Sequence, residues 1–252
     1  HTGVEGIERV IAVGLGKKEE LSVSAYRKAL GAAIRPLADL PLKQVVSALH
    51  EAEVRGQDDA WKVRQFVELF ESARYKFTEL KTESAVPKPK SAKVIFLAQD
   101  ENSEALLDRG IRIGAALATG MEIAKNMSNL PGNICTPGYM ADQALKLAKH
   151  YKKLKAKVLE EEEIADLGMH SFLSVSKGSV EPAKLIIMEY SGEGAKGKPH
   201  VIIGKGLTFD AGGISIKPAQ GMDEMKYDMA GGASIIGTMA AIAELQLPIH
   251  VV

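Results

Sequence analysis

The chain has 252 residues, enough for one large domain or two domains of ordinary size. Its 32 basic and 32 acidic side chains give a formal net charge of zero, which argues against an extended surface for nucleic acid or anionic membrane. Cys135 is the only cysteine, so an internal disulfide and a cysteine-based zinc site are excluded, and a cytoplasmic location is favoured. The longest uncharged stretch, residues 229–243, is shorter than the roughly 20 residues that span a bilayer, so no membrane association is expected.

The first 98 residues alternate segments typical of strands and of helices. Residues 7–13 form an apolar run that predicts a strand, and the run ends in a Gly-x-Gly sequence. A dinucleotide-binding fingerprint needs a third glycine where the chain has Glu19, so an ordinary strand-to-helix turn is the better interpretation. Residues 81–93 hold two prolines and four lysines, which predicts an exposed, extended connection. The other predicted elements here are helices from Ser24 to residue 37 and over 61–76, and strands at 45–46 and 94–97.

Beyond residue 98 the sequence predicts two helices first, and then strands that alternate with helices. Apolar residues recur three and four positions apart over 101–127, which predicts one long helix, and Thr136-Pro137 is a start signal for a helix over 139–151. Strands that alternate with helices then predict a doubly wound α/β sheet. The elements of this part are helices over 160–169 and 233–245, strands at 172–175, 185–190 and 201–203, and the start of a buried strand in 247–252.

The richest segment for chemistry is 201–232, where two lysines and two aspartates lie among glycines. Lys205 follows the predicted strand 201–203 and is flanked by glycines, Asp210 follows five residues later, and Lys217 and Asp228 come next. Loops beyond strand ends are where open α/β sheets build their sites. Carboxylates are hard ligands for divalent cations, and a lysine beside such cations loses its proton more easily and becomes a nitrogen ligand. A second, protonated lysine would stabilise an oxyanion.

Plainer interpretations exist for each of these residues. Aspartates also cap helices and turns, and a lysine before proline is common in loops. Asp223 and Glu224 suit the N-terminus of a short helix better than a metal site. The six histidines form no H-E-x-x-H pair, and neither a phosphate-binding G-x-x-x-x-G-K-[ST] loop nor a G-x-S-x-G elbow occurs, so these classes of site are excluded.

The sequences GKGLTFDAGGISIKP at 204–218 and GMDEMKYDMAGGA at 221–233 resemble the leucyl (cytosol) aminopeptidase family of two-metal exopeptidases. The N-x-P-x-N-x-x-T-P pattern at 129–137 is similar to the entry of that family's catalytic domain. The resemblance implies two divalent ions, manganese or zinc. It implies that the metal ligands include Lys205, Asp210 and Asp228, that Lys217 is the catalytic lysine, and that Met225 lines the pocket for the N-terminal side chain.

The resemblance also implies a domain plan and an activity. Residues 1–98 would be a partial N-terminal α/β domain, 99–128 a connecting helix and 129–252 a partial doubly wound α/β catalytic domain. The expected reaction is release of N-terminal residues, preferably leucine and similar ones, from peptide substrates by a homo-hexamer. The family's N-T-D-A-E-G-R stretch, whose arginine holds a bicarbonate, does not occur after Met229. The expectation is therefore an interior portion of a longer protein, inactive by itself.

An alternative from another class is a catalytically inert binding or scaffold protein on the same fold. Its N-terminal α/β domain would supply the contacts, and nucleic acid would be one type of partner. Zero net charge argues against nucleic acid as the main partner, and the presence of both lysines and both aspartates in 205–228 argues against loss of the catalytic site. Salt-sensitive binding to duplex DNA without peptidase activity would favour this alternative.

Overall fold

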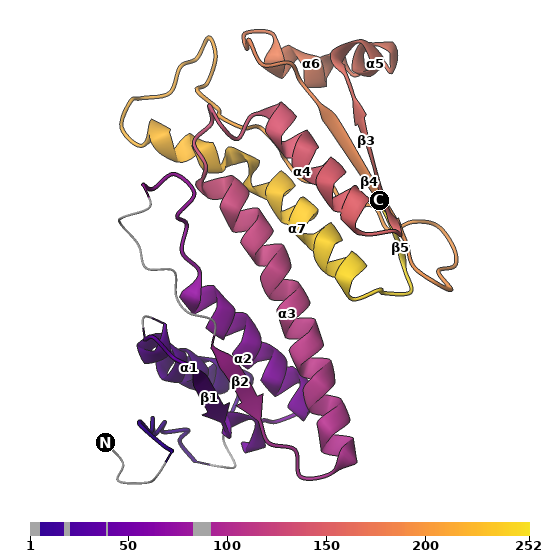
Figure 1. Cartoon of the computed structure of the whole chain (residues 1–252). Coiled ribbons are helices and arrows are strands. Elements are labelled where there is room, and N and C mark those ends of the chain that lie inside the picture. Colours follow the sequence, from indigo (N-terminus) through magenta and orange to yellow (C-terminus); the bar gives the residue numbers. More distant parts are fainter. Residues whose placement is uncertain (1–5, 18–20, 39, 83–91) are drawn as a thin grey trace. The chain divides into compact units, whose positions relative to one another are not determined.

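A computed structural model describes residues 6–17, 21–38, 40–82 and 92–252. Within it the chain forms two compact units, His1–Ala118 and Thr119–Val252, and the division falls inside one long helix, α3. Figure 1 labels the helices and strands of both units. The mixed α/β class predicted from the sequence is confirmed, since each unit combines helices with a small sheet.

The first unit is built around two helices and a parallel pair of strands. Tyr26 and Leu30 of α1 and Phe66 and Phe70 of α2 belong to its buried apolar cluster, and the ring of Phe66 lies edge-on to Phe96 of β2. Burial of such side chains is the main favourable term in folding. The elements are α1 (Val23–Ile34), η2 (Arg35–Leu37), β1 (Gln44–Ser47), η3 (Leu49–Glu51), α2 (Asp59–Arg74) and β2 (Lys93–Phe96), followed by the first part of α3 (Glu101–Asn129).

The predicted helices and two predicted strands of this unit are confirmed, but the strand predicted at 7–13 is wrong. Its described backbone is irregular, and Val10 and Ile11 are exposed. The described sheet of this unit consists of β1 and β2, with Gln44 opposite Lys93 and Ser47 opposite Phe96, and residues 7–13 do not belong to it. An apolar run without a ladder of hydrogen bonds does not form a strand. Most of the connection predicted at 81–93 lies outside the described residues.

The second unit packs helices on a three-stranded sheet in the order β3-β4-β5. Helix α4 contacts β3, β4 and α7, and α7 also contacts β4 (Figure 1). Neighbouring strands run antiparallel, with Leu154 opposite Tyr190 and Tyr190 opposite Val251. The elements are the end of α3, then α4 (Pro137–His150), β3 (Leu154–Leu159), α5 (Glu161–Asp166), α6 (His170–Ser176), β4 (Leu185–Ser191), η4 (Met222–Met229), α7 (Ala230–Glu244) and β5 (His250–Val251).

Local sequence signals explain where these helices begin. Thr136 caps α4, because its side-chain oxygen accepts a hydrogen bond of 3.2 Å from the backbone N–H of Tyr139, and Pro137 occupies the first helical position. Glu160 and Glu163 form a reciprocal capping box at the start of α5. None of the helices in the described ranges is long and apolar enough to cross a membrane.

Two predicted strands of this unit differ from the structure. Residues 172–175 belong to the helix α6, since a short apolar run fits either period. Residues 201–203 are extended but are not a buried strand, and Ile203 is 90% exposed. One side of this segment is hydrogen-bonded to the end of the chain. The backbone N–H of His200 donates to the carbonyl of His250, and that of Ile202 donates to the carbonyl of Val252, both at 2.9 Å. An isolated parallel bridge joins His200, which lies outside the named strands, to Val251 of β5.

Candidate functional site

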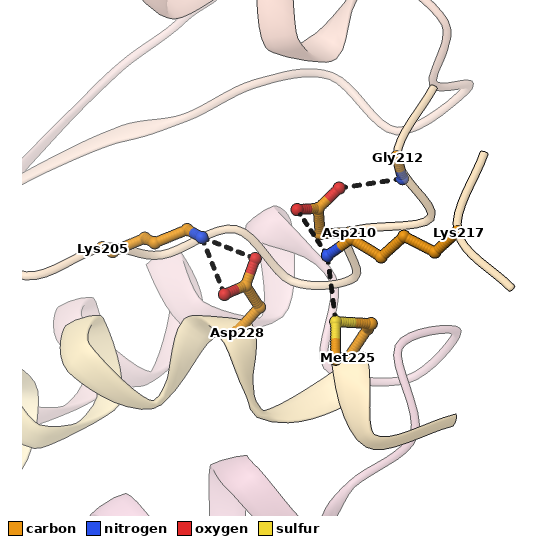
Figure 2. Close-up of polar contacts among 6 residues, drawn as sticks. All are labelled: Lys205, Asp210, Gly212, Lys217, Met225 and Asp228. Carbon is orange, nitrogen blue, oxygen red and sulfur yellow. Dashed lines mark hydrogen bonds and ion pairs between the residues drawn. The ribbon is translucent and has the colours of Figure 1, made fainter. Parts of the chain in front are cut away.

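The five predicted site residues lie together in the second unit, on the loop after the extended segment 200–202 and on η4 (Figure 2). Lys205, Asp210 and Lys217 are on the loop, whereas Met225 and Asp228 are on η4 directly before α7. The η4 helix is anchored by Met229, which is fully buried. The loop and the helix therefore present two lysines and two carboxylates to the same region.

The first pair joins Lys205 to Asp228. The Lys205 Nζ lies 2.7 Å from Oδ1 and 2.6 Å from Oδ2 of Asp228, so the ammonium donates to both carboxylate oxygens (Figure 2). The Lys205 side chain is 57% exposed and that of Asp228 is 23% exposed. Because a solvent-exposed pair contributes little to folding stability, this arrangement favours a local role in the site over a structural one.

The second pair joins Lys217 to Asp210. The Lys217 Nζ donates to Asp210 Oδ2 at 2.9 Å, and the backbone N–H of Gly212 donates to Oδ1 at 2.9 Å. The turn depends on Gly212, whose φ of +93° suits glycine, and it is closed by a 2.9 Å bond from the N–H of Lys217 to the carbonyl of Ala211. Met225 contributes its Sδ at 3.0 Å from the Lys217 Nζ (Figure 2).

These contacts lower the pKa of Asp210 below its ordinary value of 3.8. The largest cause is the hydrogen bond from Lys217, followed by the N–H of Gly212, and the positive charges of Lys217 and Lys205 act in the same direction. Asp210 is therefore ionised at neutral pH. The charge of Lys205 makes the smallest contribution to this lowering of the Asp210 pKa.

Replacing Lys217 with methionine is expected to raise the pKa of Asp210 towards its ordinary value, because the strongest hydrogen bond to the carboxylate is lost. With its pKa lowered, the carboxylate contributes stability above its unfolded-state pKa and loses it as the pH falls through the folded-state pKa. Carbon-detected NMR titration of the Asp210 carboxyl group in metal-free protein measures the shift. Lys196→Met, on an exposed turn, is the control, and an equal Asp210 pKa in wild type and Lys217→Met would contradict the assignment.

The donor atoms suit a divalent cation in charge and type. Asp210 and Asp228 offer carboxylate oxygens, and Lys205 offers a nitrogen once it is deprotonated. In the present arrangement each carboxylate is neutralised by its own lysine, so a cation would replace these lysine contacts. Within the described ranges no group of three or more His, Cys, Asp or Glu side chains is gathered to hold a metal ion.

The structure places the five predicted residues close together, and it adds contacts that the sequence did not identify. Met225, expected to line a substrate pocket, lies against Lys217. The sequence did not reveal two backbone hydrogen bonds. The N–H of Gly212 donates to Asp210, and the N–H of Gly232 donates to the carbonyl of Lys205 at 2.7 Å. The signal was present in the glycine doublets 212–213 and 231–232, since such doublets permit close backbone approach.

Comparison with known proteins gives a consistent result over both units. Residues 122–252 match the sequence profile of the catalytic domain of the cytosol aminopeptidase family, and residues 1–84 match that of its N-terminal domain. A "Probable cytosol aminopeptidase" of Methylobacillus flagellatus is 48% identical over 244 residues, and one of Nitrosomonas eutropha is 46% identical over 246 residues. These alignments cover 97% and 98% of this chain and 49% of each relative.

A comparison with solved structures points to the same family. The bottromycin maturation enzyme BotP in complex with Mn superposes with a TM-score of 0.79 at 28% identity, covering 95% of this chain and 48% of that one. The chain thus spans about half the length of the curated relatives it matches. With profile matches to both domains and identities of this size, the chain belongs to the cytosol aminopeptidase family.

Proposed function

We propose that the protein is a metal-dependent aminopeptidase that releases N-terminal residues, preferably leucine and similar ones, from peptides. The observation that carries the proposal is the pairing of Lys205 with Asp228 and of Lys217 with Asp210 in the segment that resembles the family's metal site. Membership of the family and the domain matches support it. In this proposal residues 129–252 belong to the catalytic domain, 99–128 connect the domains, and 1–98 belong to the N-terminal domain.

Lys205, Asp210 and Asp228 would hold two divalent ions together with further ligands, and the manganese complex of BotP favours Mn²⁺ over Zn²⁺. Bound ions of this type supply Lewis acidity and lower the pKa of water. The further family properties proposed for the protein are a bicarbonate beside the metals, a homo-hexameric assembly and a cytoplasmic location.

The chain's own residues have separate tasks in this mechanism. Lys217 Nζ donates a hydrogen bond to the ionised Asp210, and in the reaction it would donate one to the oxyanion of the tetrahedral intermediate. Because this charge develops in the transition state, the interaction accelerates the reaction rather than tightening substrate binding. Met225 lies against the same ammonium and would meet the N-terminal side chain of the peptide with its apolar atoms.

Removal of the metal tests the proposal. Dialysis of the native protein against a chelator is expected to abolish hydrolysis of leucine p-nitroanilide, and added Mn²⁺ or Zn²⁺ is expected to restore it. Elemental analysis before and after dialysis measures the bound metal. N-acetyl-leucine p-nitroanilide, which lacks the free amine, serves as the control substrate and should not be cleaved. Full activity in protein free of metal would overturn the proposal.

A further inference from the structure

Next to the Lys205–Asp228 pair, two segments of the second unit meet backbone to backbone. Gly204 and Lys205 lie on the loop, and Gly231 and Gly232 begin α7, three and four residues after Asp228. The N–H of Gly232 donates to the carbonyl of Lys205 at 2.7 Å. This contact, which we call the glycine seam, connects the residue that carries the ammonium to the helix that follows the carboxylate.

The seam leaves no room for a side chain at Gly204. A Cβ there would lie 2.5 Å from the carbonyl oxygen of Gly231 and 2.7 Å from Cγ1 of Ile235, whereas ordinary contact begins at 3.4 Å. The oxygen belongs to backbone, so it cannot rotate away as the end of a flexible side chain can. A methyl group at Gly204 must therefore separate the loop from α7.

The other flank of Lys205 is different. Among the described residues, the one atom within 4 Å of a Cβ at Gly206 is Cε of Met140, at 4.0 Å. The space at Gly232 is intermediate, since a Cβ there would lie 3.1 Å from the carbonyl oxygen of Lys205. Gly204, Gly232 and Gly206 thus form a graded series of close, intermediate and open positions around one lysine.

We infer that Gly204 and Gly232 are positioning residues that set the distance between Lys205 and Asp228. Asp228 is fixed from its own side, because the adjacent Met229 and the nearby Ala233 of α7 are fully buried. A loop displaced from α7 therefore carries Lys205 away from a carboxylate that does not follow. Binding and catalytic sites lose function when their groups are displaced by more than about 0.5 Å. For the metal, this inference rests on the proposed function.

The test compares Gly204→Ala with Gly206→Ala in the full chain by two measurements. Hydrogen exchange of the Gly232 amide reports the seam directly and needs no metal. Titration with Mn²⁺, followed by electron paramagnetic resonance, reports the site. Gly204→Ala is expected to accelerate exchange of the Gly232 amide about 10-fold or more and to weaken Mn²⁺ binding by about 10- to 100-fold, the range seen when groups that orient metal ligands are changed. Gly206→Ala is expected to change neither by more than about twofold.

Two further variants keep the test decisive. Gly232→Ala repeats it with the smaller overlap, should Gly204→Ala fail to fold. Gly237→Ala disturbs α7 away from the seam, so a purely structural effect would weaken Mn²⁺ binding there too. Equal effects of Gly204→Ala and Gly206→Ala, or of Gly204→Ala and Gly237→Ala on Mn²⁺ binding, would overturn the inference. A wild-type protein that binds no Mn²⁺ would count against the proposed function, and the exchange rate of the Gly232 amide would still decide the inference.

Discussion

Replacing Asp228 with asparagine is expected to lower kcat/KM for leucine p-nitroanilide by at least about 10²-fold and to reduce bound metal. Asparagine keeps the shape of the side chain but removes the charge that now balances Lys205 at 2.6 Å. Because groups that only orient metal ligands account for 10- to 100-fold, the loss of a ligand itself should cost no less. Steady-state kinetics and elemental analysis of the purified full-length protein measure both effects.

Asp223→Asn provides the matched control on the same helix, η4. Asp223 is exposed and lies in the first turn of η4, where a negative charge suits the helix N-terminus. Its replacement is expected to change kcat/KM less than about twofold, since it alters a surface charge alone. If Asp228→Asn retained wild-type metal content and activity, or if both variants lost activity equally, Asp228 would not be a metal ligand.

The sequence predicted helices well because their signals are local. The three- and four-residue spacing over 101–127 needed no knowledge of the fold, and α3 extends over Glu101–Asn129. The cap at Thr136 likewise gave the start of α4 to within two residues. Strands were less predictable, because a strand exists only with a partner. The apolar runs at 7–13 and 201–203 are similar in composition to β4, but neither is a strand in the structure.

For the site, too, the sequence shows which residues are present but not which of them are in contact. The types and spacing of the lysines and aspartates are visible in the sequence, and they predicted that the four would lie together. Which lysine meets which aspartate is not visible, since Lys205 is five residues from Asp210 but pairs with Asp228, 23 residues away. That choice follows from the glycine seam, which places the loop against the start of α7. Only tertiary structure supplies that information.

The pairing also determines the balance of charge in the site. Each carboxylate is paired with an ammonium, so neither Asp210 nor Asp228 is an uncompensated negative charge. Repulsion between such charges would raise a carboxyl pKa, whereas that of Asp210 is lowered. In the proposed function the same lysines would have further tasks, Lys205 in ligation and Lys217 in catalysis.

The largest expected effect on stability lies at another close contact in the second unit, where α3 crosses α7. A Cβ at Gly120 would lie 2.5 Å from the carbonyl oxygen of Gly237, and a Cβ at Gly237 would lie 3.0 Å from the carbonyl carbon of Gly120. Gly237→Ala is expected to destabilise the protein by about 1–3 kcal/mol, the usual cost of overpacking. Calorimetry should show a melting temperature lower by several degrees.

Gly31→Ala in α1 is the matched comparison, and it should stabilise the protein instead of destabilising it. Gly31 also lies inside a helix, but no described atom lies within 4 Å of a Cβ placed there, apart from the helix's own backbone. Alanine is favoured over glycine in helices by about 1 kcal/mol, so this variant should melt at a higher temperature. The two substitutions are chemically identical and differ in the space around them. If both raised the melting temperature, helix propensity would outweigh packing at the α3–α7 crossing, and the close approach of the two helices would not be needed for stability.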